Sequence, residues 1–331
     1  MQNQPALFKD HHKIFAVQPD NFDQLALEIF RYQATINPVY SAFVQALGIE
    51  AGRVARLEDI PFLPVRFFKD KEIISAELTP QQVFESSGTN GMQPSKHMVA
   101  DLSIYERSFT LCFEQFFGPV NNWCVIGLLP SYLETPNSSL VYMTEKLISL
   151  SKHPDSGFYL DDQEALAKKL SALEKSQQPV WLIGVSFALL DLAEKHSMKL
   201  QYTQIIETGG MKGRREEWIR PALHARLSAA FQKEHIYSEY GMTELLSQAY
   251  STAHGIFRPA PWMKILLRDE EDPFHILRKG RGTINVIDLA NIHSCSFIAV
   301  DDSGILYEDG SFEVLGRTDG SDLRGCSLLI V

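Results

Sequence analysis

The chain has 331 residues, of which 45% are hydrophobic and 22% charged, and this composition excludes disordered, collagen-like and coiled-coil proteins. The length suggests roughly two domains. Lysine and arginine number 31 against 41 aspartates and glutamates, and a net charge of −10 excludes the broad basic face that binding to nucleic acid or an anionic membrane requires.

Periodic apolar residues predict helices at 21–33 and 40–47, followed by an extended stretch at 60–69 that contains Pro61 and Pro64. Between residues 102 and 249, helical segments alternate with short apolar runs. The expected helices cover 102–117, 139–150, 162–174, 187–196, 214–232 and 243–249, and the expected strands cover 123–129, 180–183, 204–207 and 234–238. This alternation indicates an α/β fold with a largely parallel sheet covered by helices.

From about residue 257 the pattern changes to short β-rich runs at 283–287, 296–300 and 311–315. We therefore expect two domains. The first, at 1–256, is an α/β region with N-terminal helices, and the second, at 257–331, is a β-rich subdomain that ends in a short C-terminal segment.

The cysteines and the N-terminus indicate the compartment. The four cysteines are too widely spaced for a zinc site and too few for a disulfide framework; they are Cys112, Cys124, Cys295 and Cys326. The N-terminus lacks the pattern of a secretory signal, and the longest apolar stretch, 180–193, is shorter than the roughly 20 residues of a spanning helix. We expect a cytoplasmic protein with reduced thiols and no transmembrane segment.

The sharpest local feature is the sequence SSGTNGMQPSK at 86–96. Hydroxyls, glycines and a lysine in one short loop allow backbone N–H groups, hydroxyl donors and a cation to approach a phosphate. The loop is not a Walker A motif, because G-x-x-x-x-G-K-[ST] is absent. A plain surface turn uses the same residue types, so the loop alone leaves both interpretations open.

A second feature is the sequence YGMTE at 240–244, directly after an expected strand. Open α/β sheets bind ligands where strands end. There a tyrosine can stack on a planar ring, a threonine can donate to a phosphate and a glutamate can hold a divalent cation. Alternatively, Thr243 is a helix cap and Glu244 is a first-turn acid.

Four motifs occur in order along the chain: SSGTNG, then ETGGMKG at 207–213, YGMTE, and GRTD at 316–319. Together they resemble the adenylate-forming superfamily of acyl-CoA synthetases, peptide-synthetase adenylation domains and luciferases. The flanking sequences FLPVRFFK, LLPSYLETPNSSLVYM and GRTDGSDLRGCSL are more specifically similar to the acyl-protein synthetase (LuxE) branch. The resemblance extends from about residue 60 to the C-terminus.

The resemblance implies a ligase that converts a fatty or other carboxylic acid and ATP into an acyl-adenylate, with Mg²⁺ as cofactor. It implies a phosphate cradle made of Ser86, Ser87, Gly88, Thr89, Gly91 and Lys96. It implies an adenine pocket lined by Gly209, Gly210 and Tyr240, with Gly241 as a further cofactor-binding residue. Thr243 would meet the α-phosphate and Glu244 would bind Mg²⁺. Asp302 would hold the ribose and Arg317 would contact ribose or phosphate, although an acidic turn and a surface Arg–Asp pair remain alternatives for these two.

The C-terminal end departs from most of the superfamily. The chain stops at Val331, so we expect the usual mobile C-terminal domain to be absent. The acyl-protein synthetase branch passes the acyl group to a cysteine near its own C-terminus, and Cys326 matches that position. Coenzyme A or an acyl carrier protein are alternative acceptors, and a buried structural thiol is an alternative role for Cys326. An acyl reductase or acyl-transferase is the implied partner protein.

Two other functions stay open. The sequence GVSFA at 184–188 approximates the G-x-S-x-G elbow of α/β-hydrolases, so a serine acyltransferase or thioesterase could use Ser186. Ala188 replaces the last glycine, and we expect Ser186 to cap a helix. A non-catalytic nucleotide-binding partner of an acyl reductase is the second alternative.

Overall fold

The computed structural model describes residues 11–87, 93–129, 135–160, 162–209 and 218–317. Tertiary contacts divide the chain into two units. The first unit contains 1–109, 241–248 and 259–312, and the second contains 110–240, 249–258 and 313–331. The division into 1–256 and 257–331 that the sequence pattern suggests stays a prediction.

The first unit is built on an antiparallel sheet with the order β12–β11–β13–β14. Its strands are β11 (Met263–Arg268), β12 (Ile276–Leu277), β13 (Gly280–Asp288) and β14 (Phe297–Leu306), and β1 (Leu63–Pro64) pairs in parallel with β14. Most of β13 and the first half of β14 are buried, as expected for strands that form the floor of a core. The β-rich runs predicted at 283–287 and 296–300 are confirmed.

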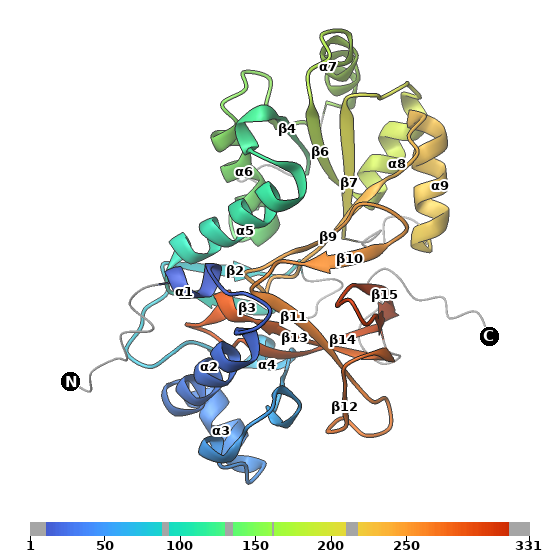
Figure 1. The fold of residues 1–331 in the computed structure, drawn as a ribbon. Coiled ribbons are helices and arrows are strands. Elements are labelled where there is room, and N and C mark those ends of the chain that lie inside the picture. The colour runs from blue at the N-terminus through green and yellow to red at the C-terminus, as the bar shows by residue number, and fades with distance from the viewer. Residues whose placement is uncertain (1–10, 88–92, 130–134, 161, 210–217, 318–331) are drawn as a thin grey trace. The chain divides into compact units, whose positions relative to one another are not determined.

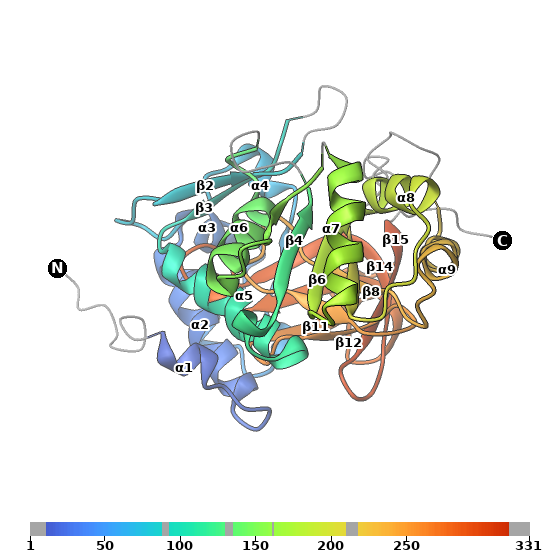
Figure 2. The same ribbon diagram turned by 90° about the horizontal axis from the view of Figure 1, so that it is seen from above.

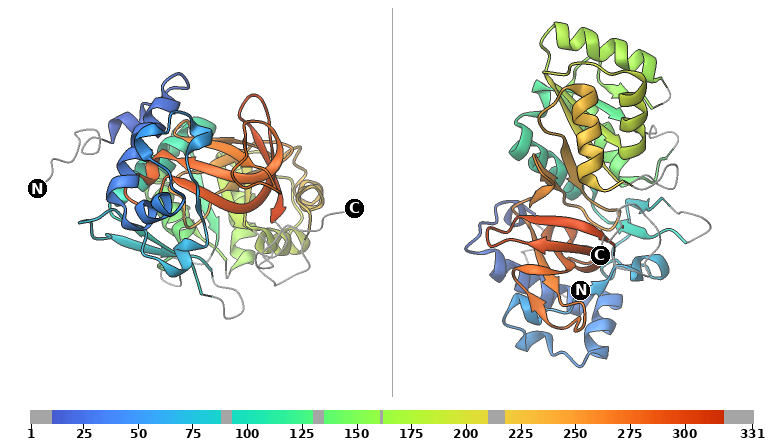
Figure 3. Two further views of the ribbon diagram at one scale, coloured as in Figure 1. Left: turned by 90° about the horizontal axis from the view of Figure 1, so that it is seen from below. Right: turned by 90° about the vertical axis from the view of Figure 1, so that its right-hand side faces the viewer.

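The N-terminal helices pack against this sheet (Figure 3). They are α1 (His12–Phe15), α2 (Phe22–Ile36) and α3 (Pro38–Ala46), followed by the 3₁₀ turns η2 (Ala51–Arg53) and η3 (Leu57–Asp59). The rings of Phe30 and Tyr40 lie 6.0 and 6.1 Å from the ring of Phe297 on β14. Asn37 caps α3 by accepting hydrogen bonds from the amides of residues 39 and 40, which explains why the helix begins there.

A separate hairpin in the first unit carries the loop that follows residue 86. Its strands are β2 (Gln82–Glu85) and β3 (Lys96–Val99), which pair antiparallel with each other. The short helix α4 (Phe67–Asp70) lies beside β3 (Figure 2). The next helix, α5 (Leu102–Phe117), continues along the chain into the second unit, and 102–117 were also its predicted bounds.

The second unit contains the parallel sheet. The order β8–β7–β6–β4–β5 is parallel throughout, and β9 then pairs antiparallel with β8. The strands are β4 (Cys124–Leu128), β5 (Gly157–Phe158), β6 (Val180–Val185), β7 (Thr203–Thr208), β8 (Tyr237–Tyr240), β9 (Ala249–Ser251), β10 (Ile256–Pro259) and β15 (Phe312–Arg317). Every residue of β4 and β6 is buried, which is typical of parallel strands with helices on both faces.

The helices of the second unit lie on both sides of this sheet, with α6 on one side and α8 and α9 on the other (Figure 1). The helices are α6 (Ser139–Ser151), α7 (Gln163–Lys175), α8 (Ser186–Lys195) and α9 (Arg220–Phe231). The predicted alternation of helices with a largely parallel sheet is therefore confirmed. None of the described helices in either unit is both long and apolar enough to cross a membrane.

The helix predicted at 243–249 is wrong. Residues 243 and 244 form a turn, and the chain then extends into β9. The amides of Leu246 and Ser247 donate hydrogen bonds of 2.8 and 3.1 Å to the carboxylate of Asp288. Because a helix would need these amides for its own backbone, the distant carboxylate prevents the helix from forming.

Gly282 on β13 offers a test of the close packing in the first unit. A Cβ at this position would lie 2.5 Å from the backbone carbonyl oxygen of Arg268, which cannot rotate away. We expect Gly282→Ala to lower the free energy of unfolding by about 2 kcal/mol, measured by urea denaturation. Gly52→Ala is the control, since no atom lies within 4 Å of its added Cβ, and equal effects of the two substitutions would contradict the prediction.

Candidate active site

The hairpin brings Ser86 and Lys96 to one end of β2 and β3. The Ser86 amide donates to the Ser95 carbonyl at 3.0 Å, and the Ser86 hydroxyl accepts from the Ser95 amide at 2.9 Å, so the base of the loop is closed. The Lys96 ammonium lies 3.7 Å from Glu85 and is about half exposed, which makes this a weak surface pair. Ser87 is exposed, and the predicted phosphate-binding residues Gly88, Thr89 and Gly91 lie outside the described residues.

The turn that contains Thr243 and Glu244 is fixed to this hairpin through two buried side chains. His97 Nδ1 lies 2.8 Å from the Thr243 carbonyl oxygen, and His97 Nε2 lies 2.9 Å from Asn291 Oδ1. Asn291 Nδ2 donates to the Glu244 carbonyl at 2.7 Å. The structure therefore brings Lys96, Thr243 and Glu244 into one hydrogen-bonded frame inside the first unit.

Asp288 holds the other end of the same turn. In addition to the amides of residues 246 and 247, its carboxylate accepts from the Ser247 hydroxyl at 2.5 Å and from the Ala290 amide at 3.1 Å. Burial raises the pKa of Asp288 to about 6, although these hydrogen bonds lower it. His97, Asn291 and Asp288 were not predicted as site residues, because no local motif marks them.

The two carboxylates predicted to bind Mg²⁺ and ribose also belong to the first unit. Glu244 is 6% exposed and Asp302 is 8% exposed, and the charges of Asp301 and Asp302 act on the partly buried Arg268. No cluster of three or more His, Cys, Asp or Glu residues that could hold a metal occurs in the described ranges. Since Mg²⁺ is usually bound by one or two carboxylates together with substrate phosphates, Glu244 fits a metal shared with a nucleotide.

The second unit carries Gly209, Tyr240 and Arg317. The register pairs Glu207 with Ser238, so Gly209 and Tyr240 follow at the carboxyl ends of neighbouring parallel strands, where open α/β sheets bind ligands. Gly209 has a φ of +67°, which favours glycine, and the Tyr240 ring packs edge-on against Phe257 at 6.0 Å. Arg317 is the last residue of β15, Gly241 is exposed in the first unit, and Gly210 and Cys326 lie outside the described residues.

Glu207 is the centre of a buried polar network in the second unit. It accepts from Arg220 Nε at 3.1 Å and from the Ser238 hydroxyl at 2.8 Å, and His224 Nε2 lies 3.5 Å away. Burial raises the pKa of Glu207, but the hydrogen bond from His224 and the charge of Arg220 outweigh it and lower the pKa to about 2. The network therefore holds an ionised carboxylate below the strand ends.

Ser186 belongs to this network and does not cap a helix, so the predicted role was wrong. The N-cap of α8 is Val185, and it makes no side-chain cap hydrogen bond. The buried Ser186 hydroxyl instead lies within hydrogen-bond distance of Glu207 Oε2 at 3.3 Å and the Gly209 carbonyl at 3.0 Å. A nucleophilic serine needs a base that accepts its proton, and no histidine is a hydrogen-bond partner of Ser186 in the described part of the chain, so the geometry does not favour a serine hydrolase.

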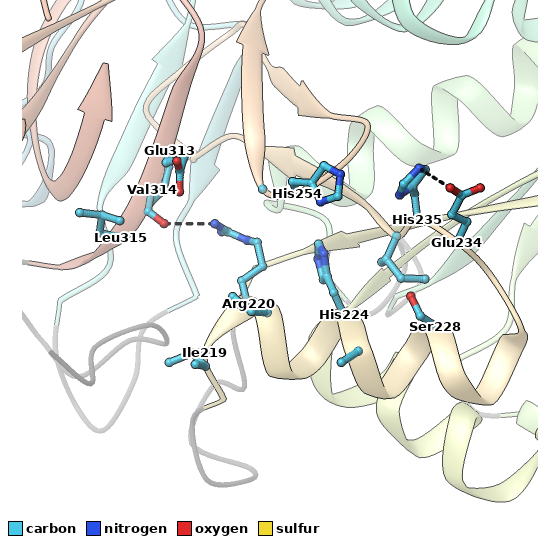
Figure 4. Close-up of a pocket in the computed structure, with 14 residues that line it drawn as sticks. Ile219, Arg220, His224, Ser228, Glu234, His235, His254, Glu313, Val314 and Leu315 are labelled. Atoms are coloured by element: carbon cyan, nitrogen blue, oxygen red, sulfur yellow. Dashed lines mark hydrogen bonds and ion pairs between the residues drawn. The ribbon is translucent and has the colours of Figure 1, made fainter. Parts of the chain in front are cut away.

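A cavity of about 490 Å³ lies beside α9 in the second unit (Figure 4). Arg220 and His224 line it from α9, and His235 and His254 line it from outside that helix. The Arg220 guanidinium donates to the Val314 carbonyl at 3.1 Å, which ties α9 to β15. No motif marks this cavity, since its walls come from separate segments around residues 219–228, 234–236, 254–255 and 313–315.

The fold is similar to that of solved ligases. A solved 2-hydroxyisobutyryl-CoA ligase in complex with 2-HIB-AMP and CoA matches with a TM-score of 0.63 and 12% identity, over 93% of this chain and 77% of that chain. ATP-bound MatB from Rhodopseudomonas palustris matches with a TM-score of 0.52 and 14% identity, over 71% of this chain and 47% of that chain. This chain therefore spans about half of the length of MatB.

The family model of the acyl-protein synthetases, LuxE, matches residues 16–331. The chain therefore belongs to the LuxE acyl-protein synthetase family, and the resemblance noted in its motifs is confirmed. A search of curated proteins gives no match to this chain.

Glu239 on β8 provides a pH test of the buried site in the second unit. Burial raises its pKa to about 7, against a hydrogen bond of 2.5 Å from the Thr208 hydroxyl. A carboxyl with a raised folded-state pKa contributes stability at low pH, and that contribution is lost as pH rises from about 4.5 through 7. As the pH rises from 5 to 8, the free energy of unfolding of wild type should therefore fall by up to about 3 kcal/mol relative to that of Glu239→Gln, which has no carboxyl at this position.

The measurement is urea unfolding of both proteins at the two pH values. Glu308→Gln serves as the control, because the Glu308 side chain is 80% exposed and forms an ion pair with the exposed Lys279. This substitution should leave the pH dependence of stability unchanged. If wild type and Glu239→Gln show the same change in stability between pH 5 and pH 8, the prediction is wrong.

Proposed function

We propose that this protein uses ATP to activate a carboxylic acid as an acyl-adenylate and then transfers the acyl group to a thiol. The observation that carries the proposal is the family match over residues 16–331. The contact between His97 on β3 and the Thr243 carbonyl supports it. This contact holds the strand that carries Lys96 beside the turn that carries Thr243 and Glu244.

In the first half-reaction a carboxylate oxygen attacks the α-phosphorus of ATP. A new O–P bond forms, the bond from the α-phosphorus to the bridging oxygen breaks, and pyrophosphate leaves with the electron pair. The main barrier is electrostatic, because two anions must approach each other. Lys96 and the hydroxyls of Ser86 and Ser87 would bind the β- and γ-phosphates, and the Thr243 hydroxyl would donate to the α-phosphate.

The remaining positions of the nucleotide site follow from the same proposal. Glu244 would hold Mg²⁺, which supplies charge neutralisation on the phosphates when it is bound. Tyr240, with Gly209 and Gly210, would line the adenine. Asp302 would hold the ribose, and Arg317 would contact the ribose or a phosphate. The low exposure of Glu244 and Asp302 supports these roles, because buried carboxylates are weakly screened by solvent.

In the second half-reaction a thiolate attacks the acyl carbonyl, the thioester bond forms, and AMP leaves. We propose Cys326 as the acceptor. Each of the other three cysteines is fully buried, and burial raises the pKa of Cys124 to about 11 and that of Cys295 to about 12. Such thiols are poor nucleophiles, which favours the fourth cysteine.

The finer parts of the proposal concern substrate, partner and location. The family name refers to acyl transfer to protein, which favours a fatty acid as substrate and an acyl reductase or acyl-transferase as partner. A reaction in the cytoplasm agrees with the charge and cysteine content. Coenzyme A and an acyl carrier protein remain alternative acceptors.

The first half-reaction is tested by carboxylate-dependent ATP–pyrophosphate exchange with acids from acetate to stearate. We expect exchange in the wild type and a loss of roughly 100-fold in Lys96→Ala and in Thr243→Ala, since each substitution removes one donor from a charged transition state. Lys279→Ala is the control, because Lys279 forms an exposed ion pair with Glu308. Absence of exchange with every acid would overturn the proposal and favour a non-catalytic nucleotide-binding protein.

The acceptor is tested with radiolabelled acid and ATP. We expect a hydroxylamine-sensitive label on the wild-type chain, no label on Cys326→Ala, and unchanged exchange activity in that variant, because the cysteine acts only after adenylation. Cys112→Ala should keep the label, since Cys112 is fully buried. Persistent labelling of Cys326→Ala would show that another group accepts the acyl chain.

A further inference from the structure

His97 and Asn291 form a fully buried polar pair next to the proposed adenylation residues. Both side chains are 0% exposed. Their hydrogen bonds go to the main chain of the turn, at the carbonyls of Thr243 and Glu244. We propose that His97 and Asn291 are positioning residues, which hold this turn so that the Thr243 and Glu244 side chains face the nucleotide at a fixed distance from Lys96. This inference rests on the proposed function.

The backbone of β3 explains how one strand serves both sides. Side chains alternate along a strand, so the exposed Lys96 and the buried His97 point to opposite faces. Lys96 can therefore reach a ligand while His97 reaches the turn. The edge-on contact between His97 and Phe68, with ring centroids 5.7 Å apart, fixes the plane of the imidazole.

The hydrogen-bond count shows that the arrangement is not ordinary core packing. Both ring nitrogens of His97 face acceptors, namely the Thr243 carbonyl and Asn291 Oδ1. Reversing the Asn291 amide gives no relief, because its oxygen would then face the Glu244 carbonyl, to which Nδ2 now donates. A neutral imidazole has one N–H, so it can donate to only one of the two acceptors at a time.

Burial keeps the ring neutral at pH 7, since it lowers the pKa of His97 to about 4 against the two hydrogen bonds that raise it. One of the two contacts therefore lacks its hydrogen, which costs stability in a buried site. The cost falls on the Thr243 carbonyl or on Asn291 Oδ1, whereas the Glu244 carbonyl keeps its donor in Asn291 Nδ2. The pair is kept in contact with both carbonyls of the turn despite this cost, which points to the position of Thr243 and Glu244 as its function.

The turn is also held from its other end. Asp288 binds the amides of Leu246 and Ser247, so the segment from 243 to 247 is fixed on both sides. Removing the anchor at His97 and Asn291 should therefore release residues 243–245 while 246 and 247 remain held. That local signature distinguishes a positioning role from general loss of stability.

The experiment uses the full-length chain and two variants, His97→Leu and Asn291→Leu. The first readout is hydrogen–deuterium exchange of the peptide that covers 241–248, measured without ATP or Mg²⁺. We expect exchange to be faster by about tenfold or more in both variants, with the second unit unchanged. His293→Leu is the matched control, because His293 is a partly buried histidine of the same unit whose pKa burial also lowers to about 4.

The second readout is the exchange reaction with pyrophosphate. We expect kcat to fall roughly 10–100-fold in both variants with little change in KM for the carboxylic acid. Asn291→Leu should also raise the Mg²⁺ concentration needed for half-maximal rate, because Asn291 holds Glu244. His97→Gln keeps one donor and should recover part of kcat.

The outcomes separate the two proposals. If no acid supports exchange with pyrophosphate in the wild type, the proposed function fails, and hydrogen–deuterium exchange at 241–248 still decides the anchoring role. If that peptide exchanges at the wild-type rate in His97→Leu and Asn291→Leu, or equally fast in His293→Leu, the positioning role is overturned. An unchanged Mg²⁺ dependence in Asn291→Leu would overturn its role toward Glu244.

Discussion

Buried backbone groups must find hydrogen-bond partners, and this requirement shapes the segment on which the candidate site depends. After Tyr240 the strand ends, and residues 243 and 244 form a turn. Its amides are bound by Asp288 and two of its carbonyls face Asn291 and His97. The Thr243 and Glu244 side chains therefore take their positions from three side chains that are far away in the sequence.

The two central carboxylates show how the type of donor decides the charge of a buried acid. Glu207 and Asp288 are both buried, yet the pKa of Glu207 is lowered to about 2 and that of Asp288 is raised to about 6. Glu207 receives a hydrogen bond from His224 and faces the guanidinium of Arg220, whereas Asp288 receives hydrogen bonds from amides and a hydroxyl. The amides and the hydroxyl offset only part of the desolvation of Asp288, and the partners of Glu207 together outweigh its desolvation.

Local pattern was sufficient to predict most of the fold. The helix at 102–117 and the strand at 180–183 depend on apolar spacing that is visible within one window of sequence, and both were confirmed. The helix expected at 243–249 was wrong, because its amides are captured by a carboxylate more than 40 residues later. Likewise, His97 contacts Thr243 and Asn291, which lie 146 and 194 positions away in the sequence. No local motif can predict contacts between residues so far apart.

The charge of the chain gives a physical reason for a rigid frame around the turn. With a net charge of −10, the protein cannot attract a polyphosphate by its overall field, and Lys96 already has Glu85 nearby. In the proposed nucleotide site, Lys96 would therefore share phosphate binding with hydroxyl and amide donors, whose hydrogen bonds weaken steeply when distance or angle is wrong. A single cation tolerates small displacements better than such donors do, because its attraction changes slowly with distance. A site built largely from neutral donors therefore needs its backbone fixed more firmly than one built from lysines and arginines, and the buried contacts of His97, Asn291 and Asp288 provide that fixation.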